Sequence, residues 1–230
     1  MPVTAVSFDA DDTLWDFEFV MRRALAHVLE ELRRALPGPA TDALTVEAMI
    51  EIRDRVAAAR RGQGARLTDI RQEAFAETVR VCGHGSDELA AHLTAVYFTR
   101  RYEDVRLYPD VLPTLDALGP RYVLGLVSNG NSYPERCGLQ GRFRFAIFAE
   151  DHGAEKPDPA LFRVALRQVG CGPGQMLHVG DSLGNDVLGA RRAGVRAVWL
   201  NRSGAANGTD IRPDAEIRSL AELPAICGDF

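Results

Sequence analysis

Residues 6–15 of this chain read VSFDADDTLW, and the rest of the sequence is organised around them. Residues 3–8 are apolar and β-branched, which predicts a buried strand. Alternate residues of an extended chain point to the same side, so Asp9 and Asp11 converge on one point where the strand ends. Two converging carboxylates indicate a hard divalent cation, with magnesium as the candidate. The alternative is that they cap a turn or a helix.

Three further polar segments follow predicted strands downstream. The strands are expected over residues 123–127, 145–149 and 176–179, and the polar segments are Ser128-Asn129-Gly130, Glu155 to Pro159 with Lys156, and Gly180 to Asp186 with Asp181. In a parallel sheet with alternating helices, ligands bind at the carboxyl ends of the strands. The four segments are therefore expected at one edge of the sheet.

Each of these segments also has a purely structural interpretation. Ser128-Asn129-Gly130 is an ordinary turn signal, and Lys156 fits an exposed surface lysine. Asp186 fits a first-turn acid that the helix dipole favours. His178 lies within an apolar strand and is predicted to be a packed core residue. Trp15 is predicted to pack between the helical cap and the sheet core that are described below.

Composition narrows the function classes. The chain has 230 residues, of which 46% are apolar and 26% charged, as in an ordinary globular enzyme. Its net charge of −5 argues against a nucleic acid polymer as partner, because phosphate backbones require a basic surface. The four cysteines have no metal-binding spacing, and no apolar run reaches membrane-spanning length. We therefore expect a cytoplasmic protein without membrane insertion. The expected oligomeric state is a monomer or a homodimer.

Apolar residues at helical spacing predict four consecutive helices after Trp15. They are broken at Pro37-Gly38-Pro39, at residues 62–64 and at Gly83, and Ser86 is the expected N-cap of the last. Helices without an intervening strand can bury their apolar faces against one another as a small bundle.

From residue 108 onward, helices and strands alternate. Asp110 is predicted to cap a helix ending near Gly119, and Asp158 to cap a helix with Pro159 at its first position. Residues 183–193 are predicted to be a helix, 196–200 a strand, 201–213 a loop and 215–217 a short edge strand. The fold class is therefore α/β. A Rossmann-like parallel sheet core, residues 1–15 and 105–230, is interrupted by an inserted all-α helical-bundle cap, residues 16–104.

In their order along the chain, the four polar segments resemble the motifs of the haloacid dehalogenase-like hydrolase superfamily. The motif DxDxT corresponds to Asp9 to Thr13, and GDxxxxD to Gly180 to Asp186. A strand ending in Ser128 and the following Lys156 match the second and third motifs. The resemblance spans nearly the whole chain, and it implies a phosphatase branch in which a helical cap lies between the first and second motifs.

The resemblance implies magnesium-dependent hydrolysis of a small phosphate monoester through an aspartyl-phosphate. Asp9 is then the nucleophile and Asp11 the general acid and base. Mg²⁺ is held by Asp9, Asp181 and the backbone carbonyl of Asp11. Charge supports the scheme independently, because a carboxylate cannot approach a dianionic phosphate unless cations neutralise part of the charge.

The remaining roles also come from the resemblance. The Ser128 hydroxyl, the backbone N–H groups of Asn129 and Gly130, and Lys156 bind the phosphoryl oxygens. Thr13 fixes the loop by hydrogen bonding. Asp186 orients Lys156 or a water on the metal.

Three other functions remain open. A pyrimidine or other 5′-nucleotidase fits the opening motif locally. A 2-haloacid dehalogenase shares the fold and the nucleophile, but that branch lacks a carboxylate at the position of Asp11 and needs no metal. A catalytically silent binding protein is disfavoured by the intact acid set, because idle buried carboxylates destabilise a core.

Overall fold

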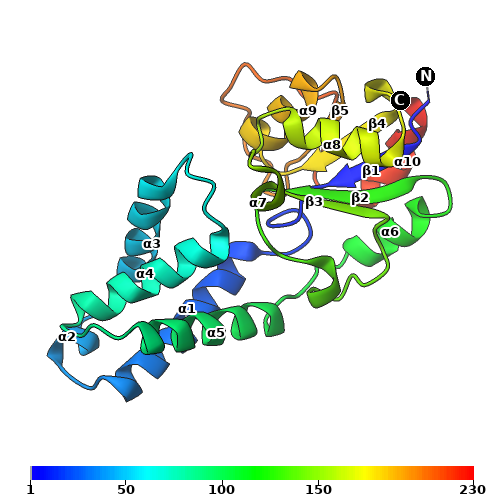
Figure 1. The fold of residues 1–230 in the computed structure, drawn as a ribbon. Helices are drawn as coiled ribbons and strands as arrows, with labels where there is room; N and C mark the ends of the chain where they lie inside the picture. Colours follow the sequence, from blue (N-terminus) through cyan, green and yellow to red (C-terminus); the bar gives the residue numbers. More distant parts are fainter. Residues whose placement is uncertain (1) are drawn as a thin grey trace. The chain divides into compact units, whose positions relative to one another are not determined.

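The chain divides into two compact units. The computed structural model describes residues 2–230 apart from the side chain of Asp229. One unit, here called the core unit, contains Asp16 and the residues before it together with Arg106–Phe230. The other, the helical unit, is Phe17–Val105. Figure 1 shows the elements of both. No helix among residues 2–230 is both long and apolar enough to cross a membrane.

The helical unit contains the four predicted helices and one short extra helix. They are α1 (Phe17–Ala35), α2 (Pro39–Asp42), α3 (Val46–Arg60), α4 (Leu67–Val81) and α5 (Asp87–Glu103). Ser86 is the N-cap of α5 as predicted, and its hydroxyl accepts a hydrogen bond from the Leu89 N–H. The extra helix α2 begins at Pro39, in the segment predicted only as a break, because proline suits the first turn of a helix.

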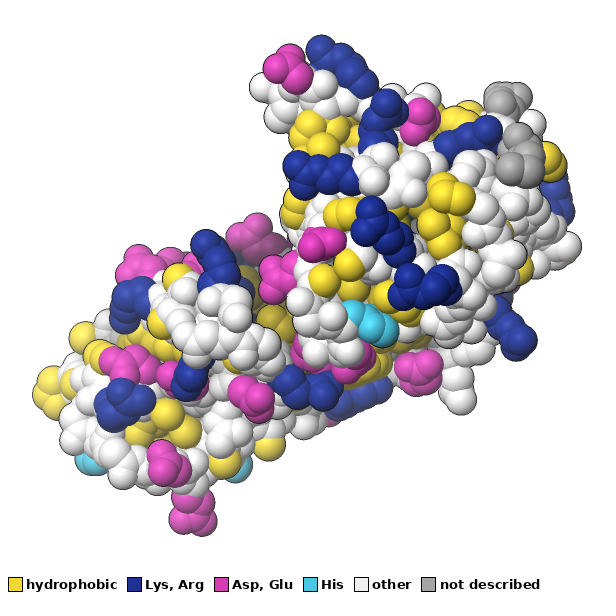
Figure 2. All heavy atoms as spheres, turned by 45° about the horizontal axis from the view of Figure 1, so that its top comes forward, with side chains coloured by type: hydrophobic (Ala, Val, Ile, Leu, Met, Phe, Trp, Pro, Cys, Tyr) yellow, Lys and Arg dark blue, Asp and Glu magenta, His cyan; other side chains and the backbone are white. Residues whose placement is uncertain are grey.

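The helices of this unit bury one apolar core and expose charged faces. Leu25, Phe75, Leu93 and Tyr97 are among its fully buried members. On the surface, Arg22 pairs with Glu18 and Glu47. Figure 2 shows basic and acidic side chains interspersed over the visible surface of the molecule. Exposed pairs of this kind stabilise little, and they mark a solvated surface.

The core unit is built on a six-stranded sheet with the order β3-β2-β1-β4-β5-β6. All five strand pairs are parallel. The strands are β1 (Ala5–Phe8), β2 (Val123–Ser128), β3 (Phe145–Phe148), β4 (Met176–Gly180), β5 (Arg196–Leu200) and β6 (Ala215–Ile217). The predicted α/β fold with a parallel sheet is confirmed.

Helices cover the sheet on both sides (Figure 1). The helices α8 (Ala160–Val169) and α9 (Leu188–Arg192) share an apolar cluster with residues of β2, β3 and β5. On the opposite side lies α6 (Val111–Leu118), which packs on α10 (Leu223–Ile226). The short helix α7 (Ala149–His152) follows β3 directly, so Ala149 belongs to a helix instead of the predicted strand.

Three predicted helices are present, but the start of each differs in detail from the prediction. Asp110 precedes α6, but its side chain makes no cap hydrogen bond there, because other partners occupy it. Pro159 stands at the N-cap position of α8, although Asp158 Oδ1 does accept the Ala160 N–H. The predicted helix over residues 183–193 begins as a π-turn at Leu183–Val187 before α9. Such turns are frequent at functional sites.

Candidate active site

The sheet order brings residues that are distant in sequence to one edge. Strand β1 lies between β2 and β4, so Asp9, Ser128 and Asp181 meet where these three strands end. A cavity of about 180 Å³ opens there. It is lined by Asp9, Asp11, Asp12, Ser128, Asn129, Gly130, Lys156, Asp181, Ser182, Asn185 and Asp186. Every predicted site residue except Thr13, which is fully buried, lines this cavity.

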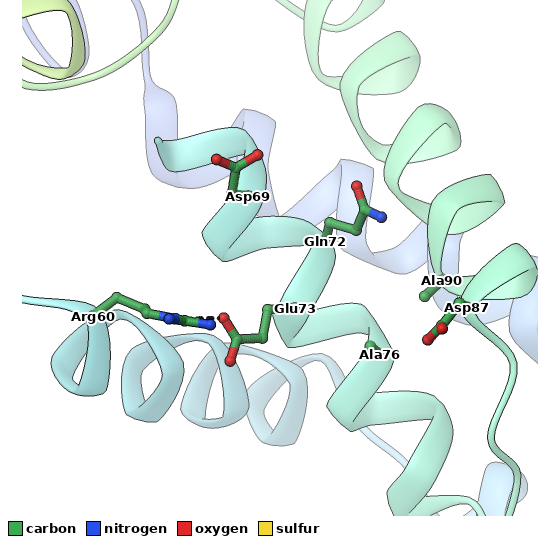
Figure 3. Close-up of a pocket in the computed structure, with 7 residues that line it drawn as sticks. All are labelled: Arg60, Asp69, Gln72, Glu73, Ala76, Asp87 and Ala90. Atoms are coloured by element: carbon green, nitrogen blue, oxygen red, sulfur yellow. Dashed lines mark hydrogen bonds and ion pairs between the residues drawn. The ribbon is translucent and has the colours of Figure 1, made fainter. Parts of the chain in front are cut away.

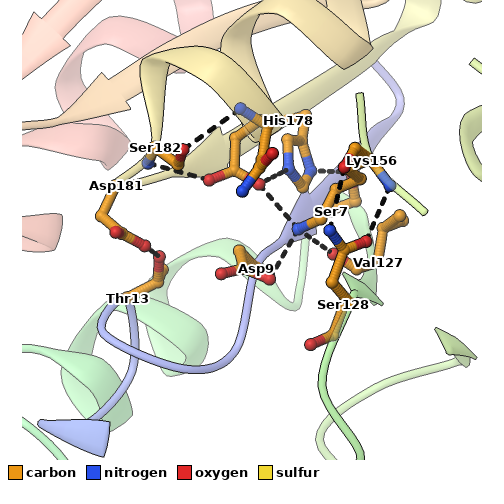
Figure 4. Close-up of polar contacts among 12 residues, drawn as sticks. Ser7, Asp9, Thr13, Val127, Ser128, Lys156, His178, Asp181 and Ser182 are labelled. Carbon is orange, nitrogen blue, oxygen red and sulfur yellow. Dashed lines mark hydrogen bonds and ion pairs between the residues drawn. The ribbon is translucent and has the colours of Figure 1, made fainter. Parts of the chain in front are cut away.

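Lys156 occupies the centre of the polar network in Figure 4. Its ammonium donates to Asp9 Oδ1 and Asp186 Oδ1, both at 2.6 Å, and to the Val127 carbonyl at 2.7 Å. An ammonium has three donors, and all three are used. Burial disfavours the charge, yet Asp186 and Asp9 outweigh burial and raise the pKa of Lys156. With 3% of its surface exposed, Lys156 is not the surface lysine of the alternative interpretation.

The amide of Asn129 fixes the backbone of Lys156. Asn129 Oδ1 accepts the Lys156 N–H at 2.7 Å, and Asn129 Nδ2 donates to the Lys156 carbonyl at 3.0 Å. This two-point contact joins the segment after α7 to the end of β2. Asn129 was predicted to contribute only its backbone N–H, so its positioning role was missed.

Asp186 is almost completely buried behind Lys156. Its Oδ2 accepts the Ser182 N–H at 2.9 Å, an arrangement that the π-turn permits. Although burial opposes ionisation, Lys156 and His178 keep the pKa of Asp186 well below its ordinary value. Asp186 therefore orients Lys156, and it is not an exposed first-turn acid.

His178 supports this network from within β4. It is fully buried, and its ring meets Phe162 edge-on at 4.8 Å between ring centroids. Burial lowers the pKa of His178 and so favours the neutral ring, although the hydrogen bond with Asp186 opposes this shift. Its Nε2 lies 3.3 Å from Asp186 Oδ1 and its Nδ1 lies 2.9 Å from Ser7 Oγ. The sequence predicted a packed core residue, which is confirmed, but the hydrogen bonds to Asp186 and Ser7 were missed.

Asp11 is oriented by two donors on one of its oxygens. Ser132 Oγ donates to Asp11 Oδ1 at 2.8 Å, and Trp15 Nε1 donates to the same atom at 3.1 Å. Trp15 is fully buried, and this bond to Asp11 was not predicted. Ser132 was also missed, although it closes the sequence SNGNS after β2. The other oxygen, Oδ2, faces Gly130 so closely that a Cβ atom on this glycine would lie 2.4 Å from it.

Ser128 and Gly130 form a small turn at the end of β2. The Gly130 N–H donates to Ser128 Oγ at 3.0 Å. In this structure the Ser128 hydroxyl accepts the Gly130 N–H, and the donation of that N–H to a phosphoryl oxygen stays a prediction. Since Ser128 Oγ is the acceptor of that bond, its own hydroxyl proton can be donated to a ligand.

Three carboxylates crowd together in the cavity. Oxygen atoms of Asp9, Asp181 and Asp186 lie within 4.8 Å of one another. Burial, together with Asp186, raises the pKa of Asp181 to about 6. Burial also raises the pKa of Asp9 well above its ordinary value, even though Lys156 opposes the shift. Carboxylates that repel one another in this way fit the all-oxygen ligand set of a magnesium ion.

Asp186 was not among the predicted metal ligands, which were Asp9, Asp181 and the backbone carbonyl of Asp11. Asp186 belongs to the carboxylate group, whereas Asp11 was expected to contribute its backbone carbonyl, an atom outside this group of side-chain oxygens. The ligand role of Asp11 stays a prediction.

Gly180 is required by the close approach of Asp186. A Cβ atom on Gly180 would lie 2.2 Å from Asp186 Cγ. We expect Gly180→Ala to lower the free energy of unfolding by about 1–3 kcal/mol, since a buried overlap must be relieved by displacing the carboxylate. Thermal unfolding followed by circular dichroism measures this.

Gly184→Ala is the matched control for that variant. Gly184 lies four residues away in the π-turn, and a Cβ atom there would meet nothing within 4 Å. Its stability should equal or slightly exceed that of the unmodified protein. A Gly180→Ala variant as stable as Gly184→Ala would contradict the packing argument.

A larger cavity, about 370 Å³, lies within the helical unit (Figure 3). Its polar lining consists of Arg60, Asp69, Gln72, Glu73 and Asp87. Arg60 already pairs with Glu73 at 2.8 Å. The lining residues are mostly exposed, and they do not form a buried hydrogen-bonded network comparable with that around Lys156. The catalytic candidate is therefore the cavity of the core unit.

The core unit thus combines a parallel sheet with a buried lysine and a group of carboxylates at the carboxyl edge of the sheet. Residues 3–194 match the haloacid dehalogenase-like hydrolases. The chain belongs to this family.

Individual relatives point to two chemistries. The chain is 30% identical to the 5-amino-6-(5-phospho-D-ribitylamino)uracil phosphatase YigB of Escherichia coli K12, over 97% of this chain and 96% of the relative. It is 36% identical, with a TM-score of 0.83, to the structure of a 2-haloacid dehalogenase of Pseudomonas syringae pv. tomato, over 97% of each chain. A magnesium-bound putative hydrolase of Bacillus subtilis is 25% identical, with a TM-score of 0.72, over 99% of each chain.

Proposed function

We propose that this protein hydrolyses a small phosphate monoester in a magnesium-dependent reaction, through an aspartyl-phosphate on Asp9. The proposal rests on one observation. Five carboxylates and one lysine line the same cavity, and three of the carboxylates have oxygens within 4.8 Å of one another. A cavity with this excess of negative charge repels a phosphate unless it also holds a cation.

Asp9, Asp181 and Asp186 would hold the magnesium ion, together with the predicted carbonyl of Asp11. When bound, the ion would neutralise charge between the nucleophile and the phosphoryl oxygens. Lys156 supplies a further positive charge at the nucleophile, because its ammonium lies 2.6 Å from Asp9 Oδ1. This bond fixes the rotation of the nucleophilic carboxylate.

The two chemical steps use Asp9 and Asp11. A carboxylate oxygen of Asp9 attacks phosphorus, and the bond between phosphorus and the leaving oxygen breaks. Asp11 donates a proton to that oxygen and then accepts one from the water that hydrolyses the aspartyl-phosphate. Ser132 and Trp15 both donate to Asp11 Oδ1 and so hold this carboxyl group in one orientation. The Ser128 hydroxyl would donate to a phosphoryl oxygen.

Dehalogenation of a 2-haloacid is the second candidate, since a well-matched solved structure is of such an enzyme. Displacement of halide from carbon requires the nucleophile but neither an acid at position 11 nor a cation. Asp11 is present and held by two donors, and Asp181 adds a third carboxylate to the group. These residues favour phosphoryl transfer. A 5′-nucleotide is one possible substrate within this proposal.

The proposal is tested by assaying phosphate release over nucleotides, sugar phosphates and phosphoglycolate, with 2-chloropropionate and halide release in parallel. We expect EDTA to abolish phosphate release and added Mg²⁺ to restore it, because the carboxylate group repels phosphate without a cation. Phosphate release unaffected by chelator would contradict the magnesium role. Halide release without phosphate release would establish the second candidate. The cap boundaries 16–104, a cytoplasmic location and a monomer or homodimer remain predictions.

A further inference from the structure

Arg202, two residues beyond the end of β5, joins two segments of the core unit. Its Nη1 donates to Asp110 Oδ2 at 2.8 Å, and its Nη2 donates to Asp110 Oδ1 at 3.0 Å. The same Nη2 donates to the backbone carbonyl of Thr13 at 3.0 Å. The guanidinium also lies over the ring of Tyr108, 4.0 Å from its centroid. Arg202 thereby connects the loop after β1 to the segment before α6.

Asp110 is itself held firmly, so Arg202 has a fixed anchor. Ser219 Oγ donates to Asp110 Oδ2 at 2.7 Å, and the Leu220 N–H donates to the same atom at 2.9 Å. Burial opposes ionisation, but the hydrogen bonds from Arg202 and Ser219 lower the pKa of Asp110. A bidentate pair between arginine and a carboxylate adds directional precision to charge attraction.

The bond from Arg202 to Thr13 leads to the carboxylate group in the cavity. Thr13 Oγ1 donates to Asp181 Oδ1 at 2.9 Å. Trp199, near the end of β5, donates from Nε1 to the backbone carbonyl of Asp181 at 2.8 Å. Residues at the end of β5 therefore restrain Asp181 at its backbone directly and at its side chain through Thr13.

A contribution to stability does not fully explain why residue 202 is an arginine. Arg202 Nε is buried and has no hydrogen-bond partner in the described part of the chain. A buried donor without a partner costs free energy, so an unpaired Nε requires an explanation. The position needs a planar group that reaches the Asp110 carboxylate and the Thr13 carbonyl together, which lysine cannot do.

We propose that Arg202 is a positioning residue: anchored on Asp110, it fixes Thr13 and, through the Thr13 hydroxyl, holds Asp181 in place to bind the magnesium ion. This inference rests on the proposed function, which places Asp181 among the magnesium ligands. Residues that orient metal ligands typically change metal affinity about 10–100-fold when they are replaced.

The test measures Mg²⁺ binding to the full chain by isothermal titration calorimetry, beside kcat, KM and Tm. Arg202→Met is expected to raise the Kd for Mg²⁺ about 10-fold or more and to lower kcat at subsaturating Mg²⁺, with little change in the KM for the phosphate monoester. Arg202→Lys keeps the charge without the two-point contact and should behave similarly. If the methionine variant fails to fold, the Arg202→Lys variant provides the test instead.

Arg191→Met is the matched control. Arg191 Nη1 pairs with Asp214 at 3.1 Å in the same unit, and its side chain is 46% exposed. This variant should bind Mg²⁺ as the unmodified protein does. An Arg202 variant with lower Tm but unchanged Mg²⁺ affinity would show a structural role only and overturn the inference.

A double-mutant cycle tests the route through Thr13. Thr13→Val removes the hydroxyl and keeps the backbone carbonyl that Arg202 contacts, whereas Thr13→Ser keeps the hydroxyl and should restore binding. In the Thr13→Val background, Arg202→Met should change the Kd for Mg²⁺ little further. If the effects of Thr13→Val and Arg202→Met on Mg²⁺ affinity are fully additive, Arg202 does not act through Thr13. If the unmodified protein releases phosphate but binds no Mg²⁺, both this inference and the metal role fail. If the unmodified protein binds Mg²⁺ and the Arg202 variants bind it equally well, the inference alone fails.

Discussion

Asp9→Asn is expected to lower phosphate release by at least about 10⁴-fold while leaving the fold intact. Asparagine keeps the shape of the side chain, and its amide oxygen can still accept the bond from Lys156, but an amide is not a competent nucleophile toward phosphorus. Asp9→Ala should be equally inactive. Turnover is measured at saturating Mg²⁺, and Tm is compared by circular dichroism.

Asp116→Asn is the control for this pair of variants. Asp116 lies in the core unit, pairs with Arg142 and has a side chain that is 59% exposed, so its loss of charge should leave activity unchanged. Turnover at the unmodified rate in either Asp9 variant would refute the assignment of the nucleophile.

Lys156→Met is expected to abolish activity and to lower the free energy of unfolding by about 3–5 kcal/mol. The ammonium that neutralises Asp9 and Asp186 is lost. Asp186, whose side chain is 1% exposed, then keeps a buried charge that its contacts with the Ser182 N–H and His178 do not neutralise. Chemical denaturation measures the stability change, and phosphate release measures the activity.

The double variant Lys156→Met, Asp186→Asn separates charge from packing. Removing the charge of Asp186 as well should recover part of the lost stability, because the buried carboxylate no longer lacks its partner Lys156. Activity should not return. A single Lys156→Met variant as stable as the unmodified protein would contradict the electrostatic account of this site.

Lys156 is the single lysine of a chain that has 27 lysines and arginines together. Its three acceptors, two carboxylate oxygens and one carbonyl, surround one nitrogen at 2.6–2.7 Å. A guanidinium is planar and larger, so it cannot present three donors from a single atom. The site therefore explains why this position differs from the other basic positions of the chain.

Several site contacts were beyond the reach of sequence patterns. The hydrogen bonds of Asp11 with Ser132 and Trp15, and those of His178 with Asp186, join residues whose types alone imply no pairing. Asp110 has the sequence context of a helix cap, yet Arg202, 92 residues away, takes its carboxylate. A local sequence pattern cannot predict a hydrogen-bond partner that comes close only in the folded chain.

Local sequence determined the elements and the order of the chemistry along the chain. Strand patterns, breaks at proline and glycine, and the cap at Ser86 depend on neighbouring residues, and a parallel sheet sends the segments after its strands to one edge. The tertiary structure alone decided the burial of Lys156, the grouping of Asp186 with Asp9 and Asp181, and the anchoring of Thr13 by Arg202. Each of these depends on distances between residues far apart in sequence, and those distances exist only once the strands are side by side.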